Sequence, residues 1–285
     1  MNRLIALLTD FGTTDTYVGV MKGVMLDINP ALHLVDLTHA IQPQNIKQAA
    51  FALLNSYSFF PPQTVFLVVV DPGVGSARKP IAVRAGHWLF VAPDNGVLSY
   101  ALRDIGHPEA AELENQLHRL KAVSNTFHGR DIFAPAAAHL TLDVSFDHLG
   151  TRVEPVMLPE PQLVIEGNFV RGEVLHIDHF GNVITSIGLL NWDSPEQLTL
   201  NPRFGTGSPF KCVPASVEVS VPVTNATVPP LAIRHTYAEV EKGEPLALVG
   251  SSGYLELSLN QGNFAEKYAV HIGDPVELRF ADRIE

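Results

Sequence analysis

The feature that most constrains the fold is a run of six apolar residues, Val65 to Val70, which Asp71 follows directly. A strand that is apolar on both faces is typical of a central strand covered by helices on each side. Shorter apolar runs surround it, and helical patterns lie between them. This alternation predicts an α/β domain with a mainly parallel sheet. The other expected strands are Leu4–Thr9, His33–Leu37, Pro80–Arg84 and Trp88–Ala92, and the expected helices are 18–25, 46–58 and 131–142.

The chain changes character at residues 154–162, which contain three prolines. Proline has no backbone N–H and does not fit the interior of a helix or a sheet. We therefore predict an N-terminal domain over 1–153, a linker over 154–162 and a C-terminal domain over 163–285. The last is expected to be all-β and barrel-like. Its expected strands are Val170–Ile177, Val183–Ile187, Ser216–Val221, Leu246–Val249, Tyr254–Leu259 and Val276–Phe280.

The charge of the chain narrows the classes of partner. The net charge is -11, from 19 Lys and Arg against 30 Asp and Glu. Nucleic acids and anionic membranes attract basic proteins, so neither is an expected partner. The longest apolar run is far shorter than the ~20 residues of a membrane span. A single cysteine, Cys212, cannot form an internal disulfide. With no recognisable signal peptide, a cytoplasmic protein is expected.

Polar segments containing Gly, Asp or His follow several of the predicted strands. Ligands of parallel sheets bind beyond the carboxyl ends of the strands, so five such segments at one edge predict a site. Each alone is also explained as a turn or a helix cap. Asp71 is harder to explain as a turn, because a carboxylate next to a buried strand needs a charged partner. Arg78 is close enough in sequence to be that partner. The segments are 9–15, 36–39, 71–78, 93–96 and 125–131.

A metal site is an alternative use of these side chains. Asp10, Asp15, Asp71, His128 and Asp131 have oxygen and nitrogen atoms that bind divalent ions. Their spacing matches no common metal-ligand pattern, and the chain has no GxSxG nucleophile elbow. We therefore expect neither a metal nor a cofactor, and a metal-dependent hydrolase is kept as an alternative.

Taken in order, the motifs resemble those of the S-adenosyl-L-methionine (SAM) hydroxide adenosyltransferases, relatives of the bacterial fluorinase and chlorinase. The resemblance spans roughly residues 3–282. It implies an N-terminal α/β domain and a C-terminal barrel-like domain. It also implies a homotrimer, in which the C-terminal domain completes the site of a neighbouring subunit. The matching segments are 8–12, 15–23, 70–75, 92–96, 127–131 and 177–182.

The resemblance implies hydrolysis of SAM to adenosine and methionine, with water attacking the ribose C5′ carbon. Asp71, Arg78 and His128 correspond to the residues that handle the water. Arginine stays protonated, so Arg78 would stabilise developing hydroxide. His128, with a reference pKa near 6.5, is a plausible proton acceptor. Asp71 is the other candidate acceptor, and the sequence leaves this choice open.

The resemblance also assigns binding roles. Asp10 would accept hydrogen bonds from the ribose hydroxyls, while Asp15 and Asp178 would face the methionine ammonium group. Phe180 would stack on adenine, and Asn182 would contact its polar edge. The remaining assignments are Ser251 at the methionine carboxylate and Asn260 and Gln261 near adenine.

Three positions depart from the fluorinase pattern. Asp71 stands where the fluorinase has a tyrosine, and Gly129 where it has a serine that holds fluoride. A carboxylate repels a halide, so both changes favour hydroxide. Ser252 replaces an arginine, which leaves open how the methionine carboxylate is neutralised. The alternatives are a halide-using 5′-halo-5′-deoxyadenosine synthase and a non-enzymatic module that binds SAM or a nucleoside.

Overall fold

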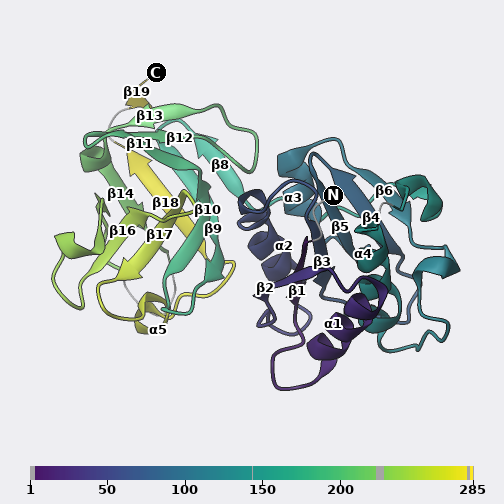
Figure 1. Cartoon of the computed structure of the whole chain (residues 1–285). Coiled ribbons are helices and arrows are strands. Elements are labelled where there is room, and N and C mark those ends of the chain that lie inside the picture. The colour runs from purple at the N-terminus through teal and green to yellow at the C-terminus, as the bar shows by residue number, and fades with distance from the viewer. Residues whose placement is uncertain (1–3, 143, 223–227, 281–282, 285) are drawn as a thin grey trace. The chain divides into compact units, whose positions relative to one another are not determined.

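A computed structural model of the chain describes residues 4–142, 144–222, 228–280 and 283–284. The chain divides into two compact units, Met1–Leu158 and Pro159–Glu285, here called the N-terminal and C-terminal units. Figure 1 shows helices and strands alternating in the first unit and mostly strands in the second. The division falls inside the proline-rich segment.

The N-terminal unit is built on a seven-stranded sheet with the order β2-β1-β3-β5-β4-β6-β7. The first three pairs in this order are parallel, and the last three are antiparallel. The sheet is thus mixed, and the prediction of a mainly parallel sheet was wrong for half of it. Only two residues connect β4 to β5, a length that joins antiparallel strands alone. The strands are β1 (Leu4–Thr9), β2 (His33–Thr38), β3 (Val65–Val69), β4 (Pro80–Ala85), β5 (Trp88–Pro93), β6 (Glu109–Glu112) and β7 (Arg152–Val153).

Helices cover both faces of this sheet. Helices α1 (Tyr17–Ile28) and α4 (Ala134–Leu140) pack together on one face, and α2 (Ile46–Leu54) packs with α3 (Ser99–Ile105). The helix expected over 46–58 ends four residues early, at Leu54, and a 3-10 turn follows it. The one expected over 131–142 is a π-helical turn, Gly129–Phe133, that continues into α4. Further 3-10 turns span Tyr57–Phe59, Gln116–His118 and Phe146–His148.

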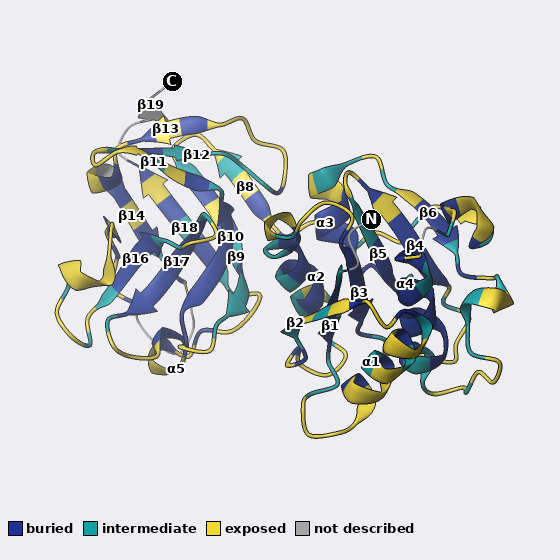
Figure 2. Cartoon of the chain, in the orientation of Figure 1, coloured by how far each residue is buried: buried dark blue, intermediate teal, exposed yellow. Residues whose placement is uncertain are grey.

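The core of the N-terminal unit explains why β3 is apolar on both faces. All five residues of β3 are buried (Figure 2). Val65, Leu67 and Val69 belong to the cluster that packs against α1 and α4. Phe66 points the other way and stacks on Phe90 with ring centroids 5.3 Å apart. Burying each such side chain contributes roughly 1.5–3 kcal/mol, so this strand anchors the loops that follow it.

The C-terminal unit is an eight-stranded sheet that nearly closes into a barrel, as predicted. Its strands run in the order β14-β18-β9-β10-β17-β16-β15, with β8 beside β9. Val219 of β14 forms a bridge with Leu231, just before β15, and so brings the two edges together. The strands are β8 (Leu163–Glu166), β9 (Phe169–Ile177), β10 (Val183–Gly188), β14 (Val217–Ser220), β15 (Ile233–Arg234), β16 (Pro245–Val249), β17 (Tyr254–Leu259) and β18 (Pro275–Phe280).

A second, four-stranded sheet completes the C-terminal unit. Its order is β11-β12-β13-β19, and the sequence patterns did not predict it. Its strands are only two to five residues long, which leaves little pattern to detect. The elements are β11 (Leu190–Ser194), β12 (Gln197–Leu200), β13 (Phe210–Cys212) and β19 (Arg283–Ile284), with α5 (Phe264–Tyr268) and the 3-10 turns Pro214–Ser216 and Tyr237–Glu239 elsewhere in the unit.

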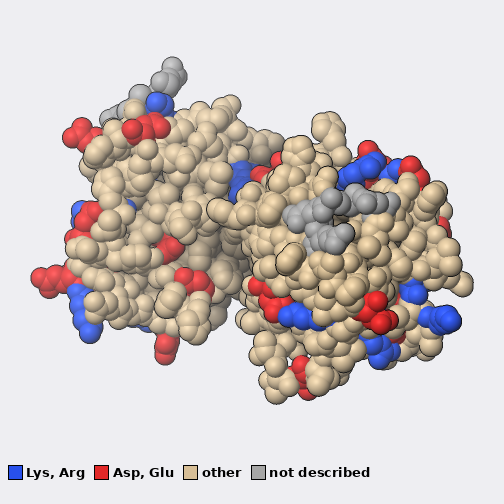
Figure 3. All heavy atoms as spheres, viewed as in Figure 1, with Lys and Arg blue, Asp and Glu red and all other residues tan. Residues whose placement is uncertain are grey.

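Charged side chains of the N-terminal unit lie mostly at its surface, where acidic and basic groups are neighbours (Figure 3). Arg84 and Arg152 both contact Glu109, at 2.6 and 3.0 Å, and these side chains are about half exposed. No helix in the described ranges is both long enough and apolar enough to span a bilayer.

Candidate active site

The loops that follow three parallel strands meet at one edge of the N-terminal sheet. Thr9 lies beside Val69 in the register of β1 and β3, so Asp10 follows β1 at the level of Val70, one residue before Asp71. The loop after β5 joins them, because the Asn95 side-chain amide donates a 2.9 Å hydrogen bond to the Val70 carbonyl. Parallel pairing therefore brings together the polar segments that the sequence placed in separate loops.

Arg78 holds the centre of this edge. Its Nε donates to Asp71 Oδ1 at 2.9 Å, and its Nη2 donates to Asp71 Oδ2. The same Nη2 lies 2.8 Å from His128 Nδ1. The side chains of Asp71 and Arg78 are only 6% and 9% exposed. The structure thus pairs Asp71 with Arg78, as the sequence predicted, and adds His128 as a second acceptor.

The contact with Arg78 fixes the tautomer of His128. A guanidinium N–H can only donate, so His128 Nδ1 accepts, and a neutral ring then carries its proton on Nε2. Burial lowers the pKa of His128, and the charge of Arg78 lowers it further, against a weaker opposite effect of Asp71. His128 is therefore neutral at pH 7, with an N–H that can donate to a bound group.

Two contacts position the loops that carry Arg78 and His128. Gly75 has φ +77°, and a Cβ there would lie 2.6 Å from the carbonyl oxygen of Asn125. Asp131 is fully buried and accepts from the Ser124 N–H at 2.8 Å and from Arg130 Nε at 2.5 Å. Burial raises the pKa of Asp131, but these hydrogen bonds outweigh it and the net shift is downward. The carboxylate of Asp131 is thus occupied in holding its own loop.

An aromatic cluster connects these loops, and no role was predicted for it from the sequence. The rings of Phe11, Tyr17 and Phe127 lie 5.2–6.0 Å apart, centroid to centroid. They tie the loop after β1 to α1 and to the segment before His128. Gly129 fits against this cluster, because a Cβ there would lie 3.2–3.4 Å from Met21, Phe127 and Phe11. In the sequence, the only sign of this cluster is that Phe11, Tyr17 and Phe127 lie within or next to the predicted polar segments.

Asp10 and Asp15 differ in their surroundings. Asp10 accepts a 2.8 Å hydrogen bond from the backbone N–H of Gln44, which links it to the loop before α2. Asp15 is exposed and lines a hollow of about 540 Å³ together with Lys22, Asp36 and His39.

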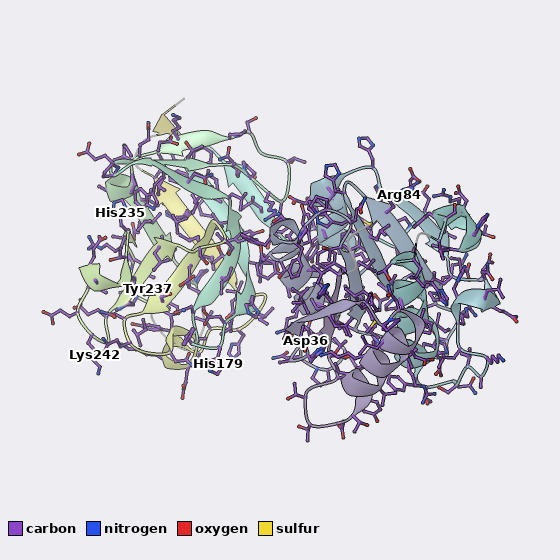
Figure 4. The ribbon with its side chains drawn as sticks, viewed as in Figure 1. Asp36, Arg84, His179, His235, Tyr237 and Lys242 are labelled. Atoms are coloured by element: carbon purple, nitrogen blue, oxygen red, sulfur yellow. The ribbon has the colours of Figure 1, made fainter. Side chains whose placement is uncertain are left out.

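The polar lining of that hollow is itself connected. Lys22 Nζ and His39 Nε2 contact the two oxygens of Asp36 at 2.7 and 2.9 Å (Asp36 is labelled in Figure 4). His39 also pairs with Thr9 through Nδ1 at 2.9 Å. Segment 36–39 was expected at this edge from the sequence, but Lys22 and His39 had no predicted role.

In the C-terminal unit, one turn between β9 and β10 holds three of the predicted residues. Asp178 Oδ1 accepts from the backbone N–H groups of Phe180 and Asn182 at 2.8 and 2.9 Å. Its Oδ2 accepts from the Asn182 side-chain amide at 2.9 Å. Phe180 is 73% exposed. The turn thus presents an aromatic ring, while the carboxylate of Asp178 is engaged within the turn.

The remaining predicted residues lie at the two ends of β17. Asn260 and Gln261 follow the strand, and Asn263 packs against Gly181, where a Cβ would collide with its side-chain amide. Ser251 is exposed in the loop that precedes β17. Ser251 therefore lies at the opposite end of β17 from Asn260 and Gln261.

Two observations concern metal-binding groups and the single cysteine. The described residues contain no group of three or more His, Cys, Asp and Glu side chains that could hold a metal ion. Cys212 is buried, and burial raises the pKa of its thiol to about 11. It is therefore protonated at pH 7 and is no nucleophile there.

Comparison with known proteins places this arrangement in one family. Residues 5–150 match the SAM hydroxide adenosyltransferase N-terminal domain, and residues 172–277 match its C-terminal domain. A Thermus thermophilus protein named (R)-S-adenosyl-L-methionine hydrolase is 38% identical over 97% of this chain and 99% of its own length. A fluorinase from Actinopolyspora mzabensis is 30% identical over 96% of each.

A solved structure shows the same fold. The crystal structure of an uncharacterized conserved protein from Thermotoga maritima superposes with a TM-score of 0.82 at 36% identity, covering 96% of this chain and 99% of that one. Both family domains match in order, and together they span most of the sequence. The chain belongs to the SAM hydroxide adenosyltransferase family.

Proposed function

We propose that this protein hydrolyses S-adenosyl-L-methionine to adenosine and L-methionine, and that, like its named relatives, it acts on the (R) epimer at sulfur. The observation that carries the proposal is the Asp71–Arg78–His128 arrangement in a chain of this family. Arg78 forms hydrogen bonds with both Asp71 and His128 at the edge where the parallel strands end.

The reaction needs no general acid, but it needs an accurately positioned water molecule. The water oxygen forms a bond to C5′, and the C5′–S bond breaks with its electron pair on sulfur. Methionine leaves as a neutral thioether, so no proton has to be supplied to it. One proton is lost from the attacking oxygen, and the sulfonium charge disappears. The protein must hold water in line with the C5′–S bond and accept that proton.

The hydrogen bonds divide these tasks. His128 uses Nδ1 to accept from Arg78, so its Nε2–H serves as a donor that holds the water oxygen. Asp71 keeps lone pairs beyond those that Arg78 occupies, since a carboxylate has about four acceptor sites. We assign proton acceptance to Asp71. A weak base suffices, because the oxygen becomes strongly acidic as its bond to carbon forms.

The substrate contacts follow the assignments made from the sequence. Asp10 would bind the ribose hydroxyls, and Asp15 the methionine ammonium group with Asp178. Phe180 offers an exposed ring for stacking on adenine. Asn182 donates its amide N–H to Asp178, which leaves its carbonyl oxygen for the adenine amino group. Ser251 would meet the methionine carboxylate, with Asn260 and Gln261 near adenine.

The rest of the proposal concerns assembly and cofactors. We propose that the reaction uses neither metal nor cofactor, and that the protein is a cytoplasmic homotrimer in which each C-terminal domain completes a neighbouring subunit's site. Analytical ultracentrifugation tests the trimer directly. A monomer that retains full activity would contradict shared sites.

The reaction itself is tested by incubating the purified protein with each sulfur epimer of SAM, with and without EDTA, chloride or fluoride, and separating the products by chromatography. Adenosine and methionine, unaffected by EDTA or halide, are expected from the (R) epimer. A halogenated nucleoside would instead indicate a halide-using enzyme, and loss of activity in EDTA would indicate a metal-dependent one.

Two variants connect the activity to the proposed residues. Asp71→Asn removes the proposed proton acceptor, and His128→Ala removes the proposed donor to the water, so each should slow turnover by at least ~100-fold. His87→Ala, at an exposed histidine of the same unit, is the matched control and should leave turnover unchanged. Near wild-type turnover in both site variants would contradict the assignment.

A further inference from the structure

His39 is a buried histidine for which the proposed reaction has no use so far. It directly follows β2, and only 6% of it is exposed. Its Nε2 lies 2.9 Å from Asp36 Oδ1, and its Nδ1 lies 2.9 Å from Thr9 Oγ1. Burying a polar ring is costly unless its nitrogens have partners. Here both partners come from the strands whose ends form the proposed site.

The charge of Asp36 sets the direction of these contacts. Burial raises the pKa of Asp36, but the contacts with Lys22 and His39 outweigh this effect, and the net shift is downward. A carboxylate can only accept, so a neutral His39 ring carries its proton on Nε2 and accepts at Nδ1. Thr9 is fully buried, so its hydroxyl group donates to His39, while the same oxygen accepts from the Phe11 N–H at 3.2 Å.

The same histidine also holds the far side of the loop after β1. The Gly12 N–H donates to the His39 carbonyl at 2.8 Å. Asp10 lies between the two attachment points, and its Oδ2 accepts from the Gln44 N–H at 2.8 Å. Gln44 has φ +67°, a left-handed conformation that is uncommon for a residue other than glycine and often occurs at functional sites. His39 thus fixes the backbone on both sides of Asp10, and Gln44 fixes one oxygen of its carboxylate.

We propose that His39 is a positioning residue: through the loop after β1, it holds Asp10 where the carboxylate can accept from the ribose hydroxyl groups. His39 does not itself face the substrate, because Thr9 and Asp36 occupy its ring nitrogens. A carboxylate receives two hydroxyl groups only if both oxygens are correctly directed, and a displacement of about 1 Å can cost ~100-fold in rate. This inference rests on the proposed function, which assigns the ribose to Asp10.

The test compares SAM with 2′-deoxy-SAM, which lacks one ribose hydroxyl group, and its readout is the ratio of the two kcat/KM values. The wild-type protein should prefer SAM by ~10–100-fold, the worth of a hydrogen bond to a charged group, and Asp10→Ala should bring the ratio close to one. A general loss of stability would lower both kcat/KM values together and leave the ratio unchanged.

Two replacements of His39 separate the contacts of its ring. The side-chain amide of asparagine ends near the position of Nδ1, and that of glutamine ends near Nε2. His39→Asn can therefore keep the contact with Thr9, whereas His39→Gln keeps only the contact with Asp36. His39→Gln should lower the ratio by ~10-fold, as expected for weakening the hydrogen bond to the ribose, and His39→Asn should restore most of it.

Thr9→Val reaches the same contact from its other end. It should lower the ratio as much as His39→Gln does, and the double variant should be no worse than either one, because both changes remove one contact. Thr64→Val is the matched control. Thr64 is also fully buried and donates a 2.8 Å hydrogen bond, to the Pro61 carbonyl, but it precedes β3 at the opposite edge of the sheet. This control should leave the ratio unchanged.

The possible results separate this inference from the proposed function. An unchanged ratio in Thr9→Val and His39→Gln, or an equal loss in Thr64→Val, would make His39 a structural residue and overturn the inference. A wild-type protein that hydrolyses SAM and 2′-deoxy-SAM equally well would overturn the ribose assignment of Asp10, and this inference with it. Absence of adenosine with the wild-type protein would instead overturn the proposed function.

Discussion

Replacing Arg78 with methionine should destabilise the N-terminal unit by about 3–5 kcal/mol, the usual cost of leaving one member of a buried ion pair alone. Asp71 is 6% exposed and receives two hydrogen bonds from Arg78. Without Arg78, its charge stays buried and unpaired. At roughly 2–4 °C per kcal/mol for a unit of this size, the melting temperature should fall by about 6–20 °C.

A double variant separates the buried charge from other effects. Replacing Asp71 with leucine as well removes both charges, and an apolar pair of similar volume is often no less stable than a buried ion pair. His128 Nδ1 would still lack its donor, which costs about 1–3 kcal/mol. The double variant should therefore recover most of the lost stability and none of the activity.

Urea unfolding followed by tryptophan fluorescence measures these differences. Each unit contains one tryptophan, so a Trp192→Phe background leaves Trp88 as the reporter of the N-terminal unit. Arg84→Met, at an exposed ion pair with Glu109, is the matched control and should unfold close to the parent. A loss below about 1 kcal/mol for Arg78→Met, or a double variant as unstable as the single one, would refute the reasoning.

Two further outcomes follow from the loops around His128. Gly75→Ala should lower turnover, because its Cβ would lie 2.6 Å from the Asn125 carbonyl oxygen and push the two loops apart. The control is Gly243→Ala, since Gly243 has a similar φ of +82° but open space around a Cβ, and this variant should leave turnover unchanged. Equal losses in the two variants would point to backbone strain alone. Turnover should also fall as the pH drops through the pKa of His128, which burial and Arg78 hold below its usual 6.5. Protonation puts a hydrogen on His128 Nδ1, which can then no longer accept from Arg78. The unfolded chain binds this proton more tightly than the folded protein, so the stability of the folded protein also falls as the pH drops over this range. A pH–rate profile with an acid limb centred above pH 7 would contradict this prediction.

Local patterns predicted most of what lies near β3. The central strand was predicted from its apolar run and the site from the polar loops beyond the strand ends, while the pairing of Asp71 with Arg78 was predicted from the cost of burying a charge. The antiparallel pairing of β4 with β5 could also have been inferred from the sequence, because Gly86 and His87 are too short a connection for a crossover between parallel strands. Strands β6 and β7 were not, since they are short and only partly apolar.

The side-chain partners were much harder to predict. Sequence distance suggested Arg78 for Asp71, but nothing in the sequence placed His128 Nδ1 against the same guanidinium. Likewise, nothing in the sequence showed that Asp178 accepts hydrogen bonds from Phe180 and Asn182 within its own turn. The carboxylate of Glu256 accepts a hydrogen bond from Tyr237, 19 positions away. Such contacts are set by the fold as a whole, which no local pattern encodes.

The proline-rich segment has a practical consequence for dissecting the chain. Its backbone is fastened to the N-terminal unit: Val156 donates to Asp94 Oδ1 and Leu158 to Ser99 Oγ, both at 2.7 Å, and Arg103 donates to the Leu158 carbonyl at 2.5 Å. A truncation after residue 153 would remove these hydrogen-bond partners of Asp94, Ser99 and Arg103. A fragment meant to fold alone should therefore keep residues 154–158, and limited proteolysis should spare them and cut beyond Leu158.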